Sequence, residues 1–236
     1  MDGSEILRRF GPEYPAAIIV QGVRIPLHSE SRFRRVYKGE DGHHYFSRFM
    51  DHSATMTFEE FSREWPKWDE RLRHEFCSEC QWLAGQEDFP AILRLIIKSG
   101  DASEWSAIAL SIASKLPQAE AFEFLSRALT NVSPERSANF AQALAKTRHP
   151  QAAETIRKHL DSLWSHPKLW DQDKFQNFVA FAAICSIRHL LELGEAPGEF
   201  EEKVKALASH QCAGSRRSCR GFLNNYFPWL DPSAEI

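Results

Sequence analysis

The dipeptide Asn-Phe occurs twice in the C-terminal half of the chain, each time early in a helical pattern that follows another helix. The first copy is Asn139-Phe140 and the second is Asn177-Phe178. They lie 38 residues apart (177 − 139), which is the length of one helix pair with its turns. Helix pairs that recur along a chain bury their apolar faces against one another. The spacing therefore predicts a stacked helical repeat in which both phenylalanines pack between helices.

Start and stop residues divide the chain from Thr57 onward into helices. Thr57 is followed by Glu60 three residues later, the pattern of a capping box. Ser103 is expected to cap a further helix, which Pro117 ends. From residue 90 the helices are expected to pair over 90–116, 118–147, 150–193 and 197–226.

Two further patterns support the register of these pairs. The tripeptide Pro-Gln-Ala opens a first helix at Pro117 and again at Pro150, 33 residues later (150 − 117). Apolar residues then recur at helical spacing, which predicts helices buried on one side. These stripes comprise Phe122, Leu125 and Leu129 in one helix and Ile156, Leu160 and Leu163 in the next.

The first 56 residues carry strand patterns instead. Residues 16–20 and 23–27 are short apolar runs separated by Gln21-Gly22. Two aromatic-rich runs, 32–37 and 43–49, flank a loop that ends in Asp-Gly, which predicts a β-hairpin. We therefore expect a mainly α chain, with a β-rich N-terminal segment at 1–56 and an α-helical repeat domain at 57–236.

The proline-started first helices and the alanine-rich second helices resemble a HEAT-type or armadillo-type α-solenoid. The resemblance covers about 140 residues, and the last two pairs depart from it because 150–193 is long. It implies a curved surface that binds proteins, or sometimes nucleic acid, and no fixed activity.

Charge and targeting patterns narrow the class of protein. The net charge of −3 is a poor match to a nucleic-acid binder, which usually carries a basic surface. No apolar run reaches the roughly 18 residues that a membrane span requires. The start, residues 1–5, lacks the pattern of a signal peptide, and the five cysteines suit reduced thiols better than a disulfide framework. We therefore expect a cytoplasmic protein without membrane association.

Asn139 and Asn177 have two interpretations. In the first, equivalent asparagines line the concave face of the repeat and bind the backbone of a partner protein. In the second, they satisfy loops or helix ends, since asparagine readily bonds nearby backbone. Under the first interpretation the partner-binding stripe comprises Arg136, Asn139, Gln142, Lys146, Lys174 and Asn177.

The predicted hairpin could instead contact nucleic acid, because its basic residues alternate with aromatic ones. Phosphates and stacked bases are bound by such mixtures. The basic residues concerned are Arg32, Arg34, Arg35, Lys38 and Arg48. The competing interpretation is an amphipathic hairpin whose arginines face solvent.

Cysteine and histidine residues form two sequence clusters, one at His74, Cys77 and Cys80 and one at His210, Cys212 and Cys219. They could supply zinc ligands, but the first cluster lies in a predicted helix and the second lacks a tight Cys-x-x-Cys. We interpret them as free structural thiols and predict no metal and no cofactor. No common phosphate-binding or hydrolase motif is present, so the chain is interpreted as leaning away from an enzyme.

These patterns together predict a non-enzymatic α-solenoid that binds another protein. A bacterial immunity or inhibitor protein, or an adaptor, would fit. The alternative is a nucleic-acid-binding protein or a HEAT-like DNA glycosylase.

Overall fold

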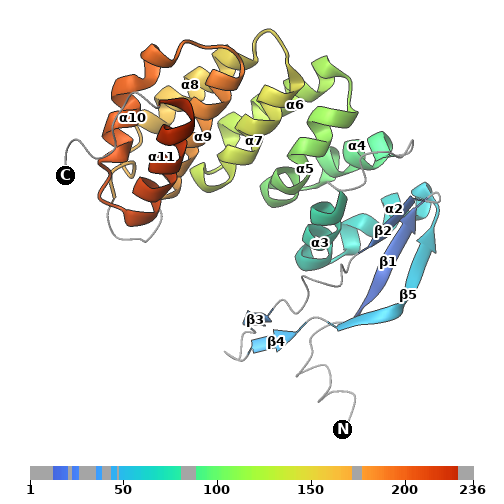
Figure 1. Ribbon diagram of the computed structural model, residues 1–236. Helices are drawn as coiled ribbons and strands as arrows, with labels where there is room; N and C mark the ends of the chain where they lie inside the picture. The colour runs from blue at the N-terminus through green and yellow to red at the C-terminus, as the bar shows by residue number, and fades with distance from the viewer. Residues whose placement is uncertain are drawn as a thin grey trace. The chain divides into compact units, whose positions relative to one another are not determined.

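A computed structural model describes residues 13–20, 23–26, 36–38, 44–46, 48–80, 89–171 and 177–227. In the strands only the backbone is described, except at Ile19 and Val20. The described part of the chain is mainly helical (Figure 1). It forms two compact units, Met1–Ile108 and Ala109–Ile236, whose boundary falls within helix α5. No described helix has the length and apolarity needed to cross a membrane.

The strands belong to the first unit and form two sheets. Their bounds are β1 (Glu13–Val20), β2 (Val23–Pro26), β3 (Val36–Lys38), β4 (His44–Phe46) and β5 (Arg48–Met56). β1 pairs antiparallel with β2 and parallel with β5, while β3 pairs antiparallel with β4. Strand β4 lies inside the predicted run 43–49, β3 overlaps the end of the run 32–37, and their antiparallel pairing is the predicted hairpin. The parallel pairing of β1 with β5 was not anticipated, because it joins segments far apart in sequence.

Among the described residues, five helical elements follow β5, the last of which, α5, contains the boundary between the two units. Their bounds are α2 (Phe58–Glu64), the 3₁₀ helix η1 (Trp65–Lys67), α3 (Glu70–Cys80), α4 (Phe89–Ser99) and α5 (Ala102–Lys115). Thr57 and Glu60 form the predicted capping box at the start of α2. The predicted cap at Ser103 is wrong, because Asp101 Oδ1 accepts from the N–H groups of Ser103 and Glu104. An acidic side chain is the better cap here because it faces the positive end of the helix dipole.

An aromatic cluster fills the first unit around Phe61, which is completely buried. Its ring stacks on Phe76 with centroids 5.2 Å apart and meets Trp68 edge-on at 5.5 Å. Trp65 joins the same cluster. Large aromatic rings in such a cluster contribute much of the apolar area that the helices bury.

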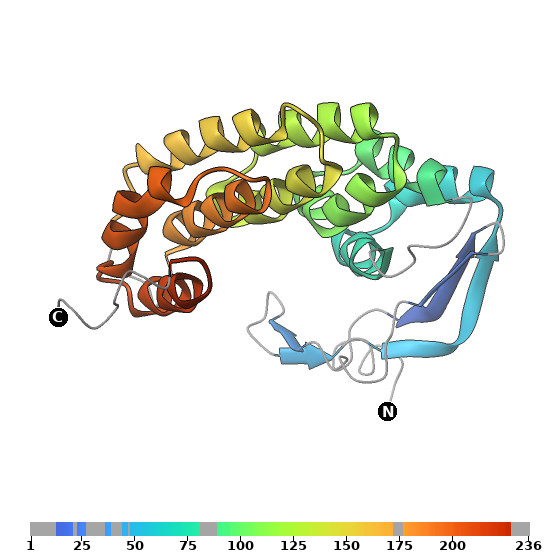
Figure 2. The same cartoon turned by 45° about the horizontal axis from the view of Figure 1, so that its top comes forward.

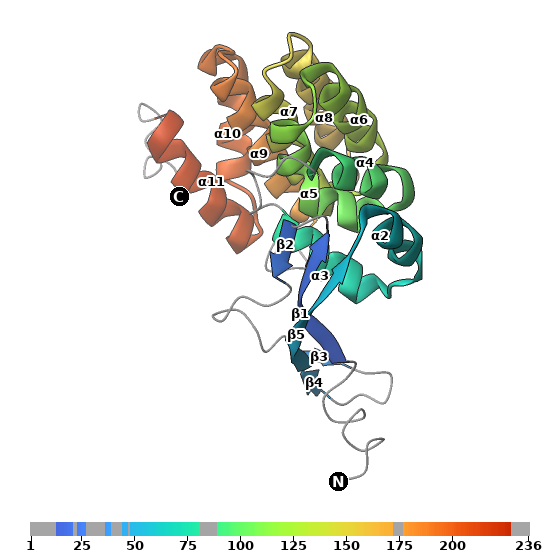
Figure 3. The ribbon, with the colours of Figure 1, turned by 90° about the vertical axis from the view of Figure 1, so that its right-hand side faces the viewer.

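The second unit continues with six helices and one 3₁₀ turn among its described residues. Their bounds are α6 (Gln118–Asn131), α7 (Pro134–Thr147), α8 (Ala152–Trp164), α9 (Phe178–Glu192), η2 (Pro197–Phe200), α10 (Glu201–Ala208) and α11 (Ala213–Tyr226). Consecutive helices pack together, and alternate ones also touch: α6 with α8, α7 with α9, and α9 with α11. Figure 2 shows α6 and α8 in one row and α7 and α9 in another, and Figure 3 shows α10 and α11 beside α9.

The predicted apolar stripes lie inside this unit. Leu125 and Leu129 of α6 are buried, and Ile156, Leu160 and Leu163 of α8 are buried as well. Phe122 is half-buried and stacks on the His149 ring, with centroids 3.8 Å apart.

The two Asn-Phe copies do not occupy equivalent positions, which corrects the expectation drawn from their spacing. Phe140 is completely buried in α7, whereas Phe178 is 42% exposed at the start of α9. The helix α7 begins at Pro134, five positions before Asn139, while α9 begins directly after Asn177. The offset of the dipeptides therefore differs from the offset of the helices that contain them.

Candidate functional site

Helix α7 presents an exposed polar stripe along one side. Asn139, Gln142 and Lys146 are exposed and lie three or four residues apart, so they share one helix face, with exposed Arg136 at its edge. The opposite side of the helix is anchored by buried residues that include Phe140 and Leu144. The predicted stripe at these four positions is therefore exposed to solvent, while the opposite side of the helix packs inside the unit.

Helix α9 presents a stripe of different chemistry beside α7. Phe178 is exposed, Phe181 and Cys185 are half-buried, and Arg188 and Glu192 are exposed. Their spacing of three or four residues again places them on one helix face. Since α7 and α9 pack together, we call the two stripes the α7–α9 face. It comprises Arg136, Asn139, Gln142, Lys146, Phe178, Phe181, Cys185, Arg188 and Glu192.

The C-terminal ends of α7 and α9 are joined through Arg148. This residue follows α7 with φ 54°, a left-handed conformation in which glycine is usual. Its Nη1 donates to the carbonyl oxygen of Glu192, 3.0 Å away, at the end of α9. A terminal carbonyl without a helical partner is thereby satisfied. Because the same ends meet, α7 and α9 run in parallel.

The carboxylate of Glu192 is held by three neighbours. Its Oε1 accepts from Arg188 Nε at 2.9 Å and lies 3.4 Å from the Tyr226 hydroxyl, while Oε2 lies 2.8 Å from His189 Nδ1. Burial raises the pKa of Glu192, but the hydrogen bonds from His189 and Arg188 outweigh it and lower the pKa overall. Burial lowers the pKa of His189, so this ring is neutral near pH 7. The carboxylate is therefore ionised and already paired.

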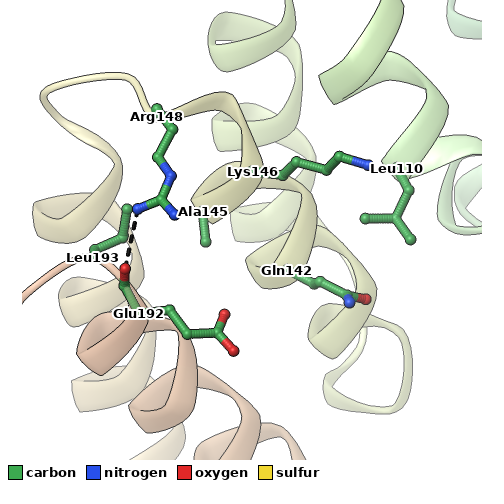
Figure 4. A pocket seen from close by; sticks show the side chains of 7 residues that line it. All are labelled: Leu110, Gln142, Ala145, Lys146, Arg148, Glu192 and Leu193. Atoms are coloured by element: carbon green, nitrogen blue, oxygen red, sulfur yellow. Dashed lines mark hydrogen bonds between the residues drawn. The ribbon is translucent and has the colours of Figure 1, made fainter.

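A depression of about 300 Å³ opens at these helix ends (Figure 4). Its lining residues are Leu110, Gln142, Ala145, Lys146, Arg148, Glu192 and Leu193. Figure 4 shows Lys146 extending from α7 toward Leu110, with Gln142 on the preceding turn of the helix. Among the described residues, none forms a hydrogen bond or an ion pair with the side chain of Gln142 or Lys146. The depression thus combines an apolar lining with uncommitted donors.

Asn177 departs from the predicted stripe because its side chain is turned inward and is only 7% exposed. Its Oδ1 accepts from the N–H groups of Val179 and Ala180, which caps α9. Its Nδ2 donates to the carbonyl oxygens of Lys168, Leu169 and Asp171. A buried amide with these partners has no capacity left for another protein. Asn177 therefore satisfies a helix end, as the second interpretation expects. It does not belong to the predicted partner-binding stripe.

The remaining predicted binding residues lie outside the described side chains. Lys174, Arg32, Arg34 and Arg35 are outside the described residues. Lys38 and Arg48 lie in β3 and β5, where only the backbone is described. Their proposed contacts with a protein or with nucleic acid stay predictions.

The sulfur clusters consist of free thiols, and four of the five cysteines are buried. Burial raises the pKa of Cys219 to about 12 and that of Cys77 well above its usual range. His210 is engaged by backbone, since Nε2 lies 2.8 Å from the Leu169 oxygen and Nδ1 accepts from the Cys212 N–H. Within the described residues, no group of three or more histidine, cysteine or acidic residues is placed to hold a metal ion.

Cys212 differs from the other thiols because it stands at the start of α11. Burial raises its pKa, but hydrogen bonds from the N–H and hydroxyl groups of Ser215 and from the N–H of Gly214 lower it overall. The residue is only 2% exposed, so this thiol has little access to solvent. We assign it a capping role at the helix N-terminus.

Sequence reasoning identified Gln142 and Lys146 but missed the other residues of the depression. Arg148 and Glu192 are 44 residues apart, and Leu110 comes from an earlier helix. Nothing in the local sequence marks these positions. The packing of α7 on α9 brings them together.

Comparison of the chain with protein-family models, with curated proteins and with solved structures finds no match.

Proposed function

We propose that this chain is a non-enzymatic protein-binding module that holds a partner on the α7–α9 face. The observation that carries the proposal is the combination of exposed Phe178 with the uncommitted donors of Gln142 and Lys146. Aromatic rings and arginine side chains are enriched at protein interfaces. The same residues lack the arrangement of nucleophile and base that a hydrolytic site requires.

Rigidity of the face supports this proposal. Ala180, Ala183 and Ile187 of α9 are buried, and Phe140 and Leu144 anchor α7. Partner contacts on a fixed surface lose less conformational freedom on binding than contacts on a mobile loop. A packed helix pair is therefore a suitable platform for a stable complex.

The packing of alternate helices favours the solenoid interpretation as part of the same proposal. In a stacked repeat, each helix touches its pair mate and the corresponding helix of the next pair. The contacts of α7 with both α6 and α9 fit this pattern. In this reading α6 and α8 are first helices, and α7 and α9 are second helices.

An immunity, inhibitor or adaptor role and a cytoplasmic setting belong to the proposal as well. Five free thiols suit a reducing compartment. A chain that acts by surface complementarity alone fits inhibitors and adaptors equally, and the partner decides between them.

Affinity capture with a matched control tests the proposal. The tagged full chain is incubated with nuclease-treated extract of its source cells, and bound proteins are quantified by mass spectrometry. The test variant is Lys146→Glu/Phe178→Ser. The control is Arg127→Glu, which reverses an exposed charge near the end of α6 in the other row of helices.

We expect the parent chain and the control to retain one protein in near-stoichiometric amount, and the double variant to lose it. Thermal unfolding of all three chains verifies that they are folded. A parallel capture uses extract that has not been treated with nuclease. Retention of nucleic acid without a stoichiometric protein in that capture would overturn the proposal.

A further inference from the structure

The depression at the ends of α7 and α9 has a distinct charge, and the inference drawn from it rests on the proposed protein-binding function. Lys146 and Arg148 of its lining carry two positive charges, and the one lining carboxylate, Glu192, is balanced by Arg188 beside it, which leaves +2. The two helix C-termini add about −0.5 each, which leaves about +1. His189 adds nothing because burial keeps it neutral. A single negative charge would balance the site.

Two donors of the site are left for an acceptor. Glu192 already bonds Arg188 and His189, and one nitrogen of Arg148 is engaged by the Glu192 carbonyl. Lys146 and Gln142 have no partner among the described residues. A carboxylate that accepts from an ammonium and an amide forms charge-assisted hydrogen bonds. A dianionic phosphate suits the site less well, because a carboxylate and two helix C-termini adjoin it.

The size and the apolar lining limit the ligand further. A volume of about 300 Å³ lies at the lower end of ligand sites. That volume equals roughly ten water molecules, which is space for one or two side chains. Leu110, Ala145 and Leu193 line the depression with apolar atoms. An aliphatic neighbour of the acidic residue would bury its surface against them.

We propose that the depression binds an acidic side chain of the partner protein, with an aliphatic residue next to it in the partner sequence. The carboxylate lies between Lys146 and Gln142, and the aliphatic side chain contacts Leu110, toward which Lys146 extends (Figure 4). Phe178 lies at the other end of α9, 14 residues before Glu192. At 1.5 Å per residue the two positions are about 21 Å apart along the helix. The partner segment therefore runs along the face from the exposed ring to the charged end.

Two synthetic peptides test this assignment on the ¹⁵N-labelled full chain. Acetyl-Leu-Glu-Leu-amide carries the required carboxylate, and acetyl-Leu-Gln-Leu-amide is its neutral match. Amide shifts are followed by NMR for the parent chain, for Lys146→Glu and for the control Arg127→Glu. A twelve-residue oligothymidylate provides the nucleic-acid arm.

We expect the glutamate peptide to shift the amides of Ala145, Arg148 and Leu193, with a Kd on the order of 1 mM for so small a ligand. The glutamine peptide should bind about fivefold more weakly, because its hydrogen bonds are not charge-assisted. Lys146→Glu should abolish this preference and Arg127→Glu should retain it. Equal affinity of the two peptides, shifts confined to other helices, or tighter binding of the oligothymidylate at these amides would overturn the assignment.

Failure of this inference is distinguishable from failure of the proposed function. If affinity capture recovers a partner that binds Lys146→Glu as well as the parent chain, the acidic-residue assignment is wrong while protein binding stands. If the glutamate peptide binds as expected but no protein is captured, the chemistry of the depression stands and the proposed function fails.

Discussion

Arg148 Nη1 lies 3.0 Å from the carbonyl oxygen of Glu192, and this bond joins the C-terminal ends of two helices whose adjoining residues are 44 positions apart. Arg148 has a left-handed backbone conformation with φ 54°, a conformation in which glycine is the usual residue. The guanidinium therefore has a structural task that glycine could not perform. Both residues also line the depression.

Substitutions at Arg148 separate the side-chain bond from the backbone conformation. Arg148→Ala removes the bond and keeps the unfavourable φ, so the free energy of unfolding should fall by about 1 kcal/mol. Arg148→Gly also removes the bond but relieves the left-handed backbone, so it should be roughly 1 kcal/mol more stable than the alanine variant. Urea unfolding of both variants measures the difference. Equal stability of the two would show that the backbone at residue 148 is unstrained.

The two asparagines of the repeated dipeptide should respond differently to alanine. Asn177→Ala removes the cap of α9 and leaves three carbonyl groups without their donor, which should cost about 2–4 kcal/mol of unfolding free energy. Asn139→Ala changes an exposed position and should stay within roughly 0.5 kcal/mol. Chemical denaturation compares them. Similar losses in both variants would restore the equivalence that the spacing predicted.

The two phenylalanines provide an independent comparison. Phe140 is completely buried, so Phe140→Ala should destabilise the chain by about 3–5 kcal/mol through lost burial and a cavity. Phe178 is 42% exposed, so Phe178→Ala should cost no more than roughly 1 kcal/mol. The midpoint of thermal unfolding would show the contrast. A large loss for Phe178→Ala would mean that its ring packs inside the unit rather than facing a partner.

Acid should weaken the fold through His159 of α8. Burial lowers its pKa from 6.5 to about 4, and its Nε2 has no hydrogen-bond partner among the described residues. Below pH 6.5 His159 is protonated in the unfolded chain, whereas in the folded chain it stays neutral down to about pH 4. The free energy of unfolding therefore falls as the pH falls from 6.5 to 4. The lowered pKa corresponds to roughly 3 kcal/mol of stability, which is fully lost near pH 4.

The variant His159→Leu isolates this contribution. Its free energy of unfolding should fall less between pH 7 and pH 4.5 than that of the parent chain, although His189 contributes a loss of the same sign because burial lowers its pKa too. Urea titrations at the two pH values measure both slopes. Parallel losses in the two chains would contradict the lowered pKa.

Local sequence patterns predicted much of the helical fold. Helices α6 and α7 together span the predicted range 118–147, because Pro117 marks a start: proline is not tolerated inside a helix. The predicted pair 150–193 contains α8 and α9, but its range does not locate the start of α9, which is Phe178. Asn177 supplies the cap of this helix.

Tertiary contacts explain what the sequence could not reveal. The pairing of β1 with β5 and the bond between Arg148 and Glu192 join distant segments, and neither leaves a local pattern. Asn177 and Asn139 looked equivalent only because a phenylalanine follows each of them. The sequence does not locate the start of a helix to within a few residues, so it could not show that Asn177 caps a helix while Asn139 lies inside one. The exposed stripe of α7 was predictable because a helix repeats every 3.6 residues.

Photo-crosslinking from single positions in living cells tests most directly whether the α7–α9 face binds a protein. A benzophenone amino acid is placed at Gln142 of α7 or, as a control, at Arg127 of α6, both of which are exposed. We expect one discrete, protease-sensitive and nuclease-resistant adduct from position 142 and none from position 127. An adduct from position 127 alone, or one from position 142 that nuclease removes, would contradict it.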